Sequence, residues 1–124
     1  MTEKFPSTGL NTLTPSVFSH SELRQVLSAY AEGVLQKGWK DYALTGEKNQ
    51  TTFCVIERGQ GDITAVIYSF SKTRSKKSGG KDFYRVFEGD RQIHRSEKFI
   101  EALNIFREAG KIKTNKKGKF KIIK

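Results

Sequence analysis

The 124-residue sequence contains few of the residues on which several classes of protein depend. It has one cysteine, Cys54, so no intramolecular disulfide framework can form. Its two histidines, His20 and His94, cannot complete a common zinc-ligand spacing with a single cysteine. No segment approaches the roughly 20 apolar residues that a membrane-spanning helix needs, and the first residues lack the apolar run of a signal peptide. We therefore expect a cytoplasmic protein without a metal ion or a membrane span.

Motifs for catalysis and for cofactor binding are also missing. Neither G-x-S-x-G nor G-x-G-x-x-G occurs, and the Gly-Lys pair at 80–81 lacks the spacing of a P-loop. Cys54 lies in the β-forming run Phe-Cys-Val-Ile, which favours a buried core thiol over a nucleophile. We expect no catalytic site and no cofactor. The alternative, a small enzyme or ligand sensor, would need a deep pocket that gathers His94, Asp41 and Arg85.

Positive charge, in contrast, is plentiful and unevenly placed. The net charge is +10, and the segment from Arg107 to Lys124 has eight basic residues and one acidic residue, which leaves +3 for the rest of the chain. A second basic segment covers residues 72–81. Such segments suit a polyanionic partner, either the backbone of DNA or RNA or an acidic protein. Because lysine contacts phosphate as a point charge, we expect sequence-neutral contact.

The candidate nucleic-acid-binding residues are the basic side chains of these two segments: Lys72, Arg74, Lys76, Lys77, Lys81, Lys111, Lys113, Lys116, Lys117, Lys119 and Lys121. Two alternatives stay open, a plain flexible loop at 72–81 and a solvated tail or short ribbon at 111–124. A second hypothesis for function is a protein-binding adaptor that uses an exposed sheet face or edge strand. The oligomeric state is left open.

The first helix is the clearest structural prediction. Ser19 and Glu22 have the spacing of a capping box, and Phe18 and Leu23 have that of a hydrophobic staple. Apolar residues then recur every three or four positions, and Gly38 is placed to end the helix.

The remaining elements are predicted from β-forming runs and turn residues. Strands are predicted over residues 39–45, 51–58, 63–71 and 83–87 and around Ile93. In the third strand, Val66, Tyr68 and Phe70 are predicted to share one face. A second helix is predicted over 97–109, with Ser96 as its N-cap.

Together these elements predict an α+β fold. It consists of an N-terminal helix, a four- to five-stranded antiparallel meander and a C-terminal helix, with both helices on one sheet face and a basic tail. Residues 1–17 are predicted to be a flexible arm, 18–110 a single domain and 111–124 the tail. The aromatic residues of the predicted strands are expected to form the core: Tyr42, Tyr68, Phe70, Tyr84 and Phe87. The alternative is that these rings form a stacking platform for single-stranded nucleic acid beside Lys72, Arg85 and Arg91.

Two segments carry a resemblance to a known family. Residues 18–30 have the sequence F-S-H-S-E-L-R-Q-V-L-S-A-Y, and residues 38–44 have the sequence G-W-K-D-Y-A-L. They resemble the patterns F-x-x-x-E-L-x-x-[IV]-L-x-x-Y and W-[RK]-D-Y-A of an uncharacterised family of small alphaproteobacterial proteins, a domain of unknown function. The resemblance covers about residues 18–106 and stops short of the lysine-rich tail. It implies the same fold and a bacterial cytosol, and it brings no function with it.

Overall fold

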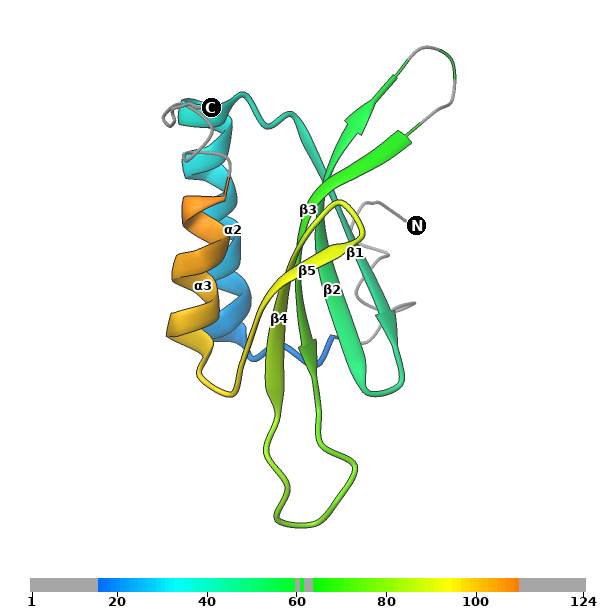
Figure 1. The fold of residues 1–124 in the computed structure, drawn as a ribbon, viewed down its shortest axis with the longest axis vertical. Helices are drawn as coiled ribbons and strands as arrows, with labels where there is room; N and C mark the ends of the chain where they lie inside the picture. Colours follow the sequence, from blue (N-terminus) through cyan, green and yellow to red (C-terminus); the bar gives the residue numbers. More distant parts are fainter. Residues whose placement is uncertain (1–15, 60, 62–63, 110–124) are drawn as a thin grey trace, which may run out of the picture.

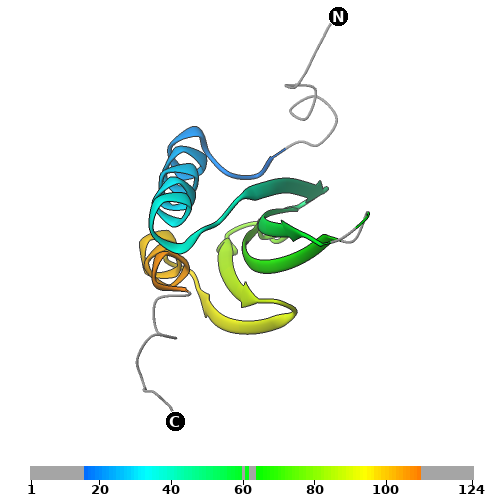
Figure 2. The ribbon, with the colours of Figure 1, turned by 90° about the horizontal axis from the view of Figure 1, so that it is seen from above.

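The computed structural model describes residues 16–59, 61 and 64–109 (Figure 1). Two helices and five strands follow one another along the chain: α2 (His20–Lys37), β1 (Asp41–Glu47), β2 (Gln50–Arg58), β3 (Thr64–Thr73), β4 (Phe83–Glu88), β5 (Arg91–Ser96) and α3 (Phe99–Glu108). The strands form one antiparallel sheet in sequence order. Both helices cover the same side of this twisted sheet (Figure 2). The predicted α+β fold is therefore confirmed.

The start and the end of α2 lie where the sequence predicts them. The Ser19 hydroxyl accepts a hydrogen bond from the Glu22 amide (3.1 Å), and the Glu22 carboxylate accepts one from the Ser19 amide (2.9 Å). Gly38 ends the helix with φ of 75°, a conformation that glycine adopts without strain. The chain then turns so that the Trp39 ring packs against Gly33, where there is no side chain.

The second helix begins two residues later than predicted. Ser96 belongs to β5, where it pairs with Tyr84, and Lys98 is the N-cap of α3. The Ser96 hydroxyl accepts a hydrogen bond from the Lys98 amide (2.9 Å) and bonds to the Glu101 carboxylate. The expected capping side chain is therefore still used, but it acts from the end of a strand.

The core lies between the helices and the sheet, and its largest members are aromatic. Phe53, Phe70 and Phe106 are fully buried, and the Phe106 ring centroid lies 6.3 Å from that of Phe53 and 5.7 Å from that of Phe70. Tyr68 and Tyr84 are buried in the same cluster. The prediction that strand aromatics form the core is confirmed for Tyr68, Phe70 and Tyr84, whereas Tyr42 is 42% exposed and Phe87 is half-buried.

One irregularity in β3 changes which residues share a face. Val66 pairs with Ile56 and Tyr68 pairs with Val55, so Ile67 is an extra residue in this strand. The prediction that Val66 and Tyr68 share a face is therefore wrong, because Tyr68 is buried whereas Val66 is 42% exposed. The side of the sheet that lies under the helices is called the covered face below, and the opposite side is called the open face.

The two predicted terminal segments fall almost entirely outside the described part of the chain. The arm over 1–17 is described only at Ser16 and Val17, and the tail over 111–124 is not described. Among the described residues, no helix combines the length and the apolar character needed to span a bilayer.

Candidate nucleic-acid interface

Five polar side chains form one row across the open face. Thr45 pairs with Thr52, Thr52 with Ser71, Ser71 with Arg85 and Arg85 with Arg95. Their neighbours along β2, β3 and β4 pack under the helices, so alternation directs these five side chains to the other side. The row, called the polar row below, contains three hydroxyls, two guanidinium groups and no carboxylate.

Phenylalanine rings hold the two guanidinium groups of the polar row. The Arg85 Cζ atom lies 5.6 Å from the ring centroid of Phe83 and 5.4 Å from that of Phe87, on either side along β4. The Arg95 Cζ atom lies 4.1 Å from the Phe83 centroid. Arg85 also donates a hydrogen bond to the Gln50 side-chain oxygen (3.0 Å). Such contacts fix the planes of the guanidinium groups without neutralising their charge.

Two polar atoms of this row are buried without a hydrogen-bond partner among the described residues. They are the Ser71 hydroxyl oxygen and Arg85 Nε, on residues that pair directly across β3 and β4. Ser71 is only 1% exposed. Because buried polar groups are nearly always hydrogen-bonded, these two atoms have unused capacity for a ligand or a water molecule. A hollow of about 130 Å³ adjoins the other end of the row and is lined by Thr45, Gly46, Glu47, Gln50 and Thr52.

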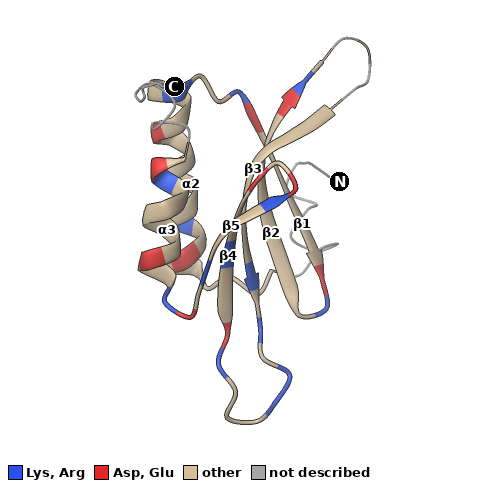
Figure 3. Ribbon diagram, viewed as in Figure 1, with Lys and Arg blue, Asp and Glu red and all other residues tan. Residues whose placement is uncertain are grey.

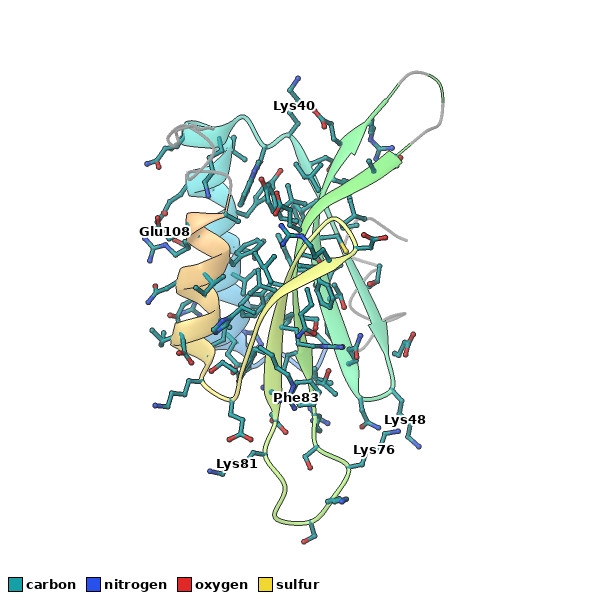
Figure 4. The ribbon with its side chains drawn as sticks, viewed as in Figure 1. Lys40, Lys48, Lys76, Lys81, Phe83 and Glu108 are labelled. Atoms are coloured by element: carbon teal, nitrogen blue, oxygen red, sulfur yellow. The ribbon has the colours of Figure 1, made fainter. Side chains whose placement is uncertain are left out.

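Basic side chains gather at the end of the sheet where two connections meet. The Arg74 amide donates a hydrogen bond to the Asn49 carbonyl (2.7 Å), which ties the β3–β4 loop to the β1–β2 turn. Five exposed cations lie on these two connections, called the basic end below: Lys48, Arg74, Lys76, Lys77 and Lys81. Figure 3 shows their charges along the loop, and Figure 4 places Lys48, Lys76 and Lys81 at the same end as Phe83. Within the described part of the chain, none of the five forms an ion pair.

Lys72, predicted together with the loop cations, lies in a different environment. It is 8% exposed on the covered face, where its ammonium bonds to Glu22 Oε1 (2.7 Å) and lies 3.8 Å from Asp82 Oδ2. The Tyr84 hydroxyl donates to the other oxygen of Glu22 (2.5 Å). Glu22, Lys72 and Tyr84, called the Glu22 cluster below, thus join α2 to β3 and β4.

The electrostatics of the Glu22 cluster follow from burial and from these bonds. Burial alone would raise the pKa of Glu22, but hydrogen bonds from Lys72, Tyr84 and the Ser19 amide outweigh it and lower the pKa. Burial, together with the bond to the Glu22 carboxylate, raises the pKa of Tyr84. At neutral pH the cluster therefore holds an ionised carboxylate between an ammonium and a neutral phenol, which is a stabilising arrangement of the fold.

The other residues considered for chemistry do not share a site. Asp41 bonds to Arg58 on the neighbouring strand (3.1 Å), His94 lies 4.0 Å from Glu101, and Arg85 lies on the open face. The sequence predicts that Cys54 is a buried core thiol, but Cys54 is only half-buried. Its neighbours Phe53 and Val55 occupy the covered face, so Cys54 lies on the open face. Partial burial raises the pKa of its thiol. No group of three metal-ligating side chains occurs in the described ranges.

Sequence reasoning missed several residues of the open face, namely Ser71, Phe83 and Arg95. The sequence held no signal for Arg95, because a regular hairpin around Gly89-Asp90 pairs Arg85 with His94, and only the register shift between Val86 and Phe87 places Arg95 opposite Arg85. The Lys111, Lys113, Lys116, Lys117, Lys119 and Lys121 side chains lie outside the described residues.

The comparisons with known proteins give a family and no further relative. The chain matches no curated protein and no solved structure. Residues 16–123 match the model of a family described as a protein of unknown function, DUF2794. This match includes the lysine-rich tail, so the expectation that the family pattern stops near residue 106 was wrong. Because the match covers most of the sequence, the chain belongs to the DUF2794 family of proteins of unknown function.

Proposed function

We propose that this protein binds nucleic acid through the phosphate backbone, without sequence selectivity. The observation that supports this proposal is the basic end, where five exposed cations have no carboxylate partner among the described residues. The lysines of the tail, from Lys111 to Lys121, are proposed to add to the same contact. Four of the five cations at the basic end are lysines, which suits contact with phosphate rather than with base edges.

Backbone contact has a measurable signature in salt. Each phosphate that a cation neutralises releases condensed counterions, so the logarithm of the binding constant falls with the logarithm of salt concentration by roughly 0.7 to 0.9 per contact. Gly79, with φ of 81°, and Gly80 lie between the loop cations, where a loop backbone can adjust to a polymer of variable shape.

The test is a salt titration of binding to mixed-sequence oligonucleotides, with the full chain and two double variants of equal charge. The Lys76→Gln/Lys81→Gln variant removes two cations from the basic end. The Arg24→Gln/Lys40→Gln variant removes two exposed cations elsewhere, and Figure 4 shows Lys40 at the opposite end of the molecule. We expect the first variant to lose about fivefold to tenfold in affinity and about 1.5 in salt slope, and the control to stay near wild type.

A third variant tests the tail in the intact chain. Replacing Lys116, Lys117, Lys119 and Lys121 by glutamine is expected to weaken binding further than the loop variant, since it removes four charges. Absence of binding at low salt, or equal loss in the loop variant and its control, would overturn the proposal.

A further inference from the structure

We infer that the open face is a binding surface for single-stranded nucleic acid, with the polar row and the two phenylalanines Phe83 and Phe87 as its contact groups. This inference rests on the proposed function and adds to it a preferred form of the polymer. The basic end by itself would hold single strands and duplexes alike, whereas the open face presents groups that a duplex cannot use.

Two cations lie side by side on the open face. Arg85 and Arg95 are paired with each other across β4 and β5, and neither forms an ion pair with a carboxylate in the described part of the chain. On the covered face the comparable cation, Lys72, is bonded to Glu22. Two adjacent guanidinium groups without internal counterions repel each other, and an anionic ligand between them would relieve that repulsion.

The fold also leaves hydrogen-bonding capacity unused in the polar row. The Ser71 hydroxyl and Arg85 Nε are buried in the centre of the row and have no hydrogen-bond partner among the described residues. Both atoms are closed off from solvent in this structure, so a ligand meets them only when the side chains above them move aside. A hydroxyl and an N–H side by side match the mixed donors and acceptors of a phosphate or a base edge.

Flat aromatic groups lie beside the cations of the open face. Phe83 and Phe87 are half-buried on the open face, and the guanidinium groups are stacked on or near their rings. Bases of a single strand expose both faces and stack on aromatic rings and on arginine planes, whereas a duplex keeps its base faces covered. The row crosses four strand-to-strand spacings, roughly 19 Å in all, which is the scale of a few nucleotides.

The open face is also continuous with the basic end. Phe83 follows Lys81 by two residues, and Figure 4 shows both side chains at the same end of the sheet. A strand with a base stacked on the Arg95 guanidinium, which lies over the Phe83 ring, can therefore continue over the lysines of the β3–β4 loop. An acidic polypeptide would neutralise the arginines, but its carboxylates would not stack on the guanidinium planes that the phenylalanine rings hold, so the observations favour the nucleic acid.

The experiment compares affinities for a single-stranded oligonucleotide and for a duplex of the same length at one fixed salt concentration. Arg95→Lys keeps the charge but removes the planar group that stacks on Phe83, and Phe83→Leu removes the ring itself. Arg24→Lys is the matched control, since Arg24 is an exposed arginine of the helix α2, on the other side of the sheet (Figure 2). We expect wild type and control to prefer the single strand, and we expect each test variant to lose roughly tenfold for the single strand while duplex binding stays unchanged.

The outcomes separate the two proposals. If wild type binds both forms equally and the test variants match it, the inference is overturned while the proposed backbone binding stands. If salt-dependent binding is missing altogether, the proposed function fails as well. Equal displacement of the single strand by polyglutamate of the same charge would assign the open face to acidic proteins and would overturn the inference. Arg95 is exposed, so its conservative variant carries the test even if Phe83→Leu does not fold.

Discussion

Lys72 and Arg85 lie on neighbouring strands, one position apart in the register, with their side chains on opposite faces of the sheet. The Lys72 ammonium bonds to Glu22 and lies near Asp82, under the helix α2. The Arg85 guanidinium donates a hydrogen bond to the neutral side-chain amide of Gln50, has no carboxylate partner among the described residues, and lies between two phenylalanine rings. The covered face therefore compensates its cation with charge, whereas the open face holds its cation by stacking.

This difference separates a cation that the fold compensates with a carboxylate from one that has no carboxylate partner among the described residues. Burying a cation costs several kcal/mol unless a carboxylate and hydrogen bonds compensate it, and the Glu22 cluster supplies both for Lys72. Arg85 is only half-buried, so solvent and the phenyl rings suffice to hold it. Its charge has no carboxylate partner among the described residues, and this is the basis of the inference that an anion binds there.

The largest effect should separate the two faces by their aromatic residues. Phe70→Ala leaves a cavity among Phe18, Tyr84 and Phe106, and should lower the free energy of unfolding by about 3–5 kcal/mol. Phe87→Ala removes a half-buried ring from the open face and should cost less than half as much. Urea unfolding of both variants measures the difference. Equal losses would show that the open face is part of the core.

The Glu22 cluster should be the next most sensitive feature. Glu22→Gln leaves Lys72 without its nearest anion and should cost about 3 kcal/mol at neutral pH, as judged by chemical unfolding. The exposed pair Arg91–Glu88 is the comparison, and Glu88→Gln should cost less than about 1 kcal/mol. If both variants lose the same unfolding free energy, the carboxylate of Glu22 stabilises Lys72 no more than Glu88 stabilises the exposed Arg91.

The same cluster predicts a dependence on pH. The folded-state pKa of Glu22 lies below its ordinary value of about 4.3, so the ionised form stabilises the fold above that value. This contribution is lost as pH falls through the lower, folded pKa. Glu22→Gln should therefore flatten the acid limb of a plot of unfolding free energy against pH. An unchanged acid limb would contradict a lowered pKa of Glu22 in the folded protein.

The smallest expected effect concerns the tightness of the covered face. A Cβ atom on Gly33 would lie 2.0 Å from the Trp39 ring, so Gly33→Ala should cost about 1–3 kcal/mol although alanine favours helices. Ser28→Ala, at an exposed position of α2, is the control and should be neutral or slightly stabilising. Thermal unfolding reports both, and a stabilised Gly33→Ala would mean that Trp39 moves away freely.

Much of the fold follows from local signals that the sequence displays. Ser19, Glu22 and Gly38 define α2 because capping bonds and a left-handed glycine act within a few residues of the chain. The order of the strands follows because short turns can join only antiparallel neighbours. The cations of the loop at 72–81 are also visible in the sequence, since clustered charge needs no folding to be recognised.

The candidate site was predictable only in part. The sequence indicates Arg74, Lys76, Lys77 and Lys81, and these residues are exposed at one end of the sheet. It groups Lys72 with them, although Lys72 points to the covered face as part of the Glu22 cluster. Composition alone cannot separate these lysines, because the difference lies in which face of β3 each residue occupies.

By itself the sequence determined the capped helix, the meander and the places where positive charge gathers, since each depends on neighbours along the chain. The tertiary structure alone decided that Thr45, Thr52, Ser71, Arg85 and Arg95 form one row. It also decided that the bulge at Ile67 turns Tyr68 inward. The physical reason is that register and burial are set by contacts between segments far apart in the chain, and one extra residue in a strand reverses every face beyond it.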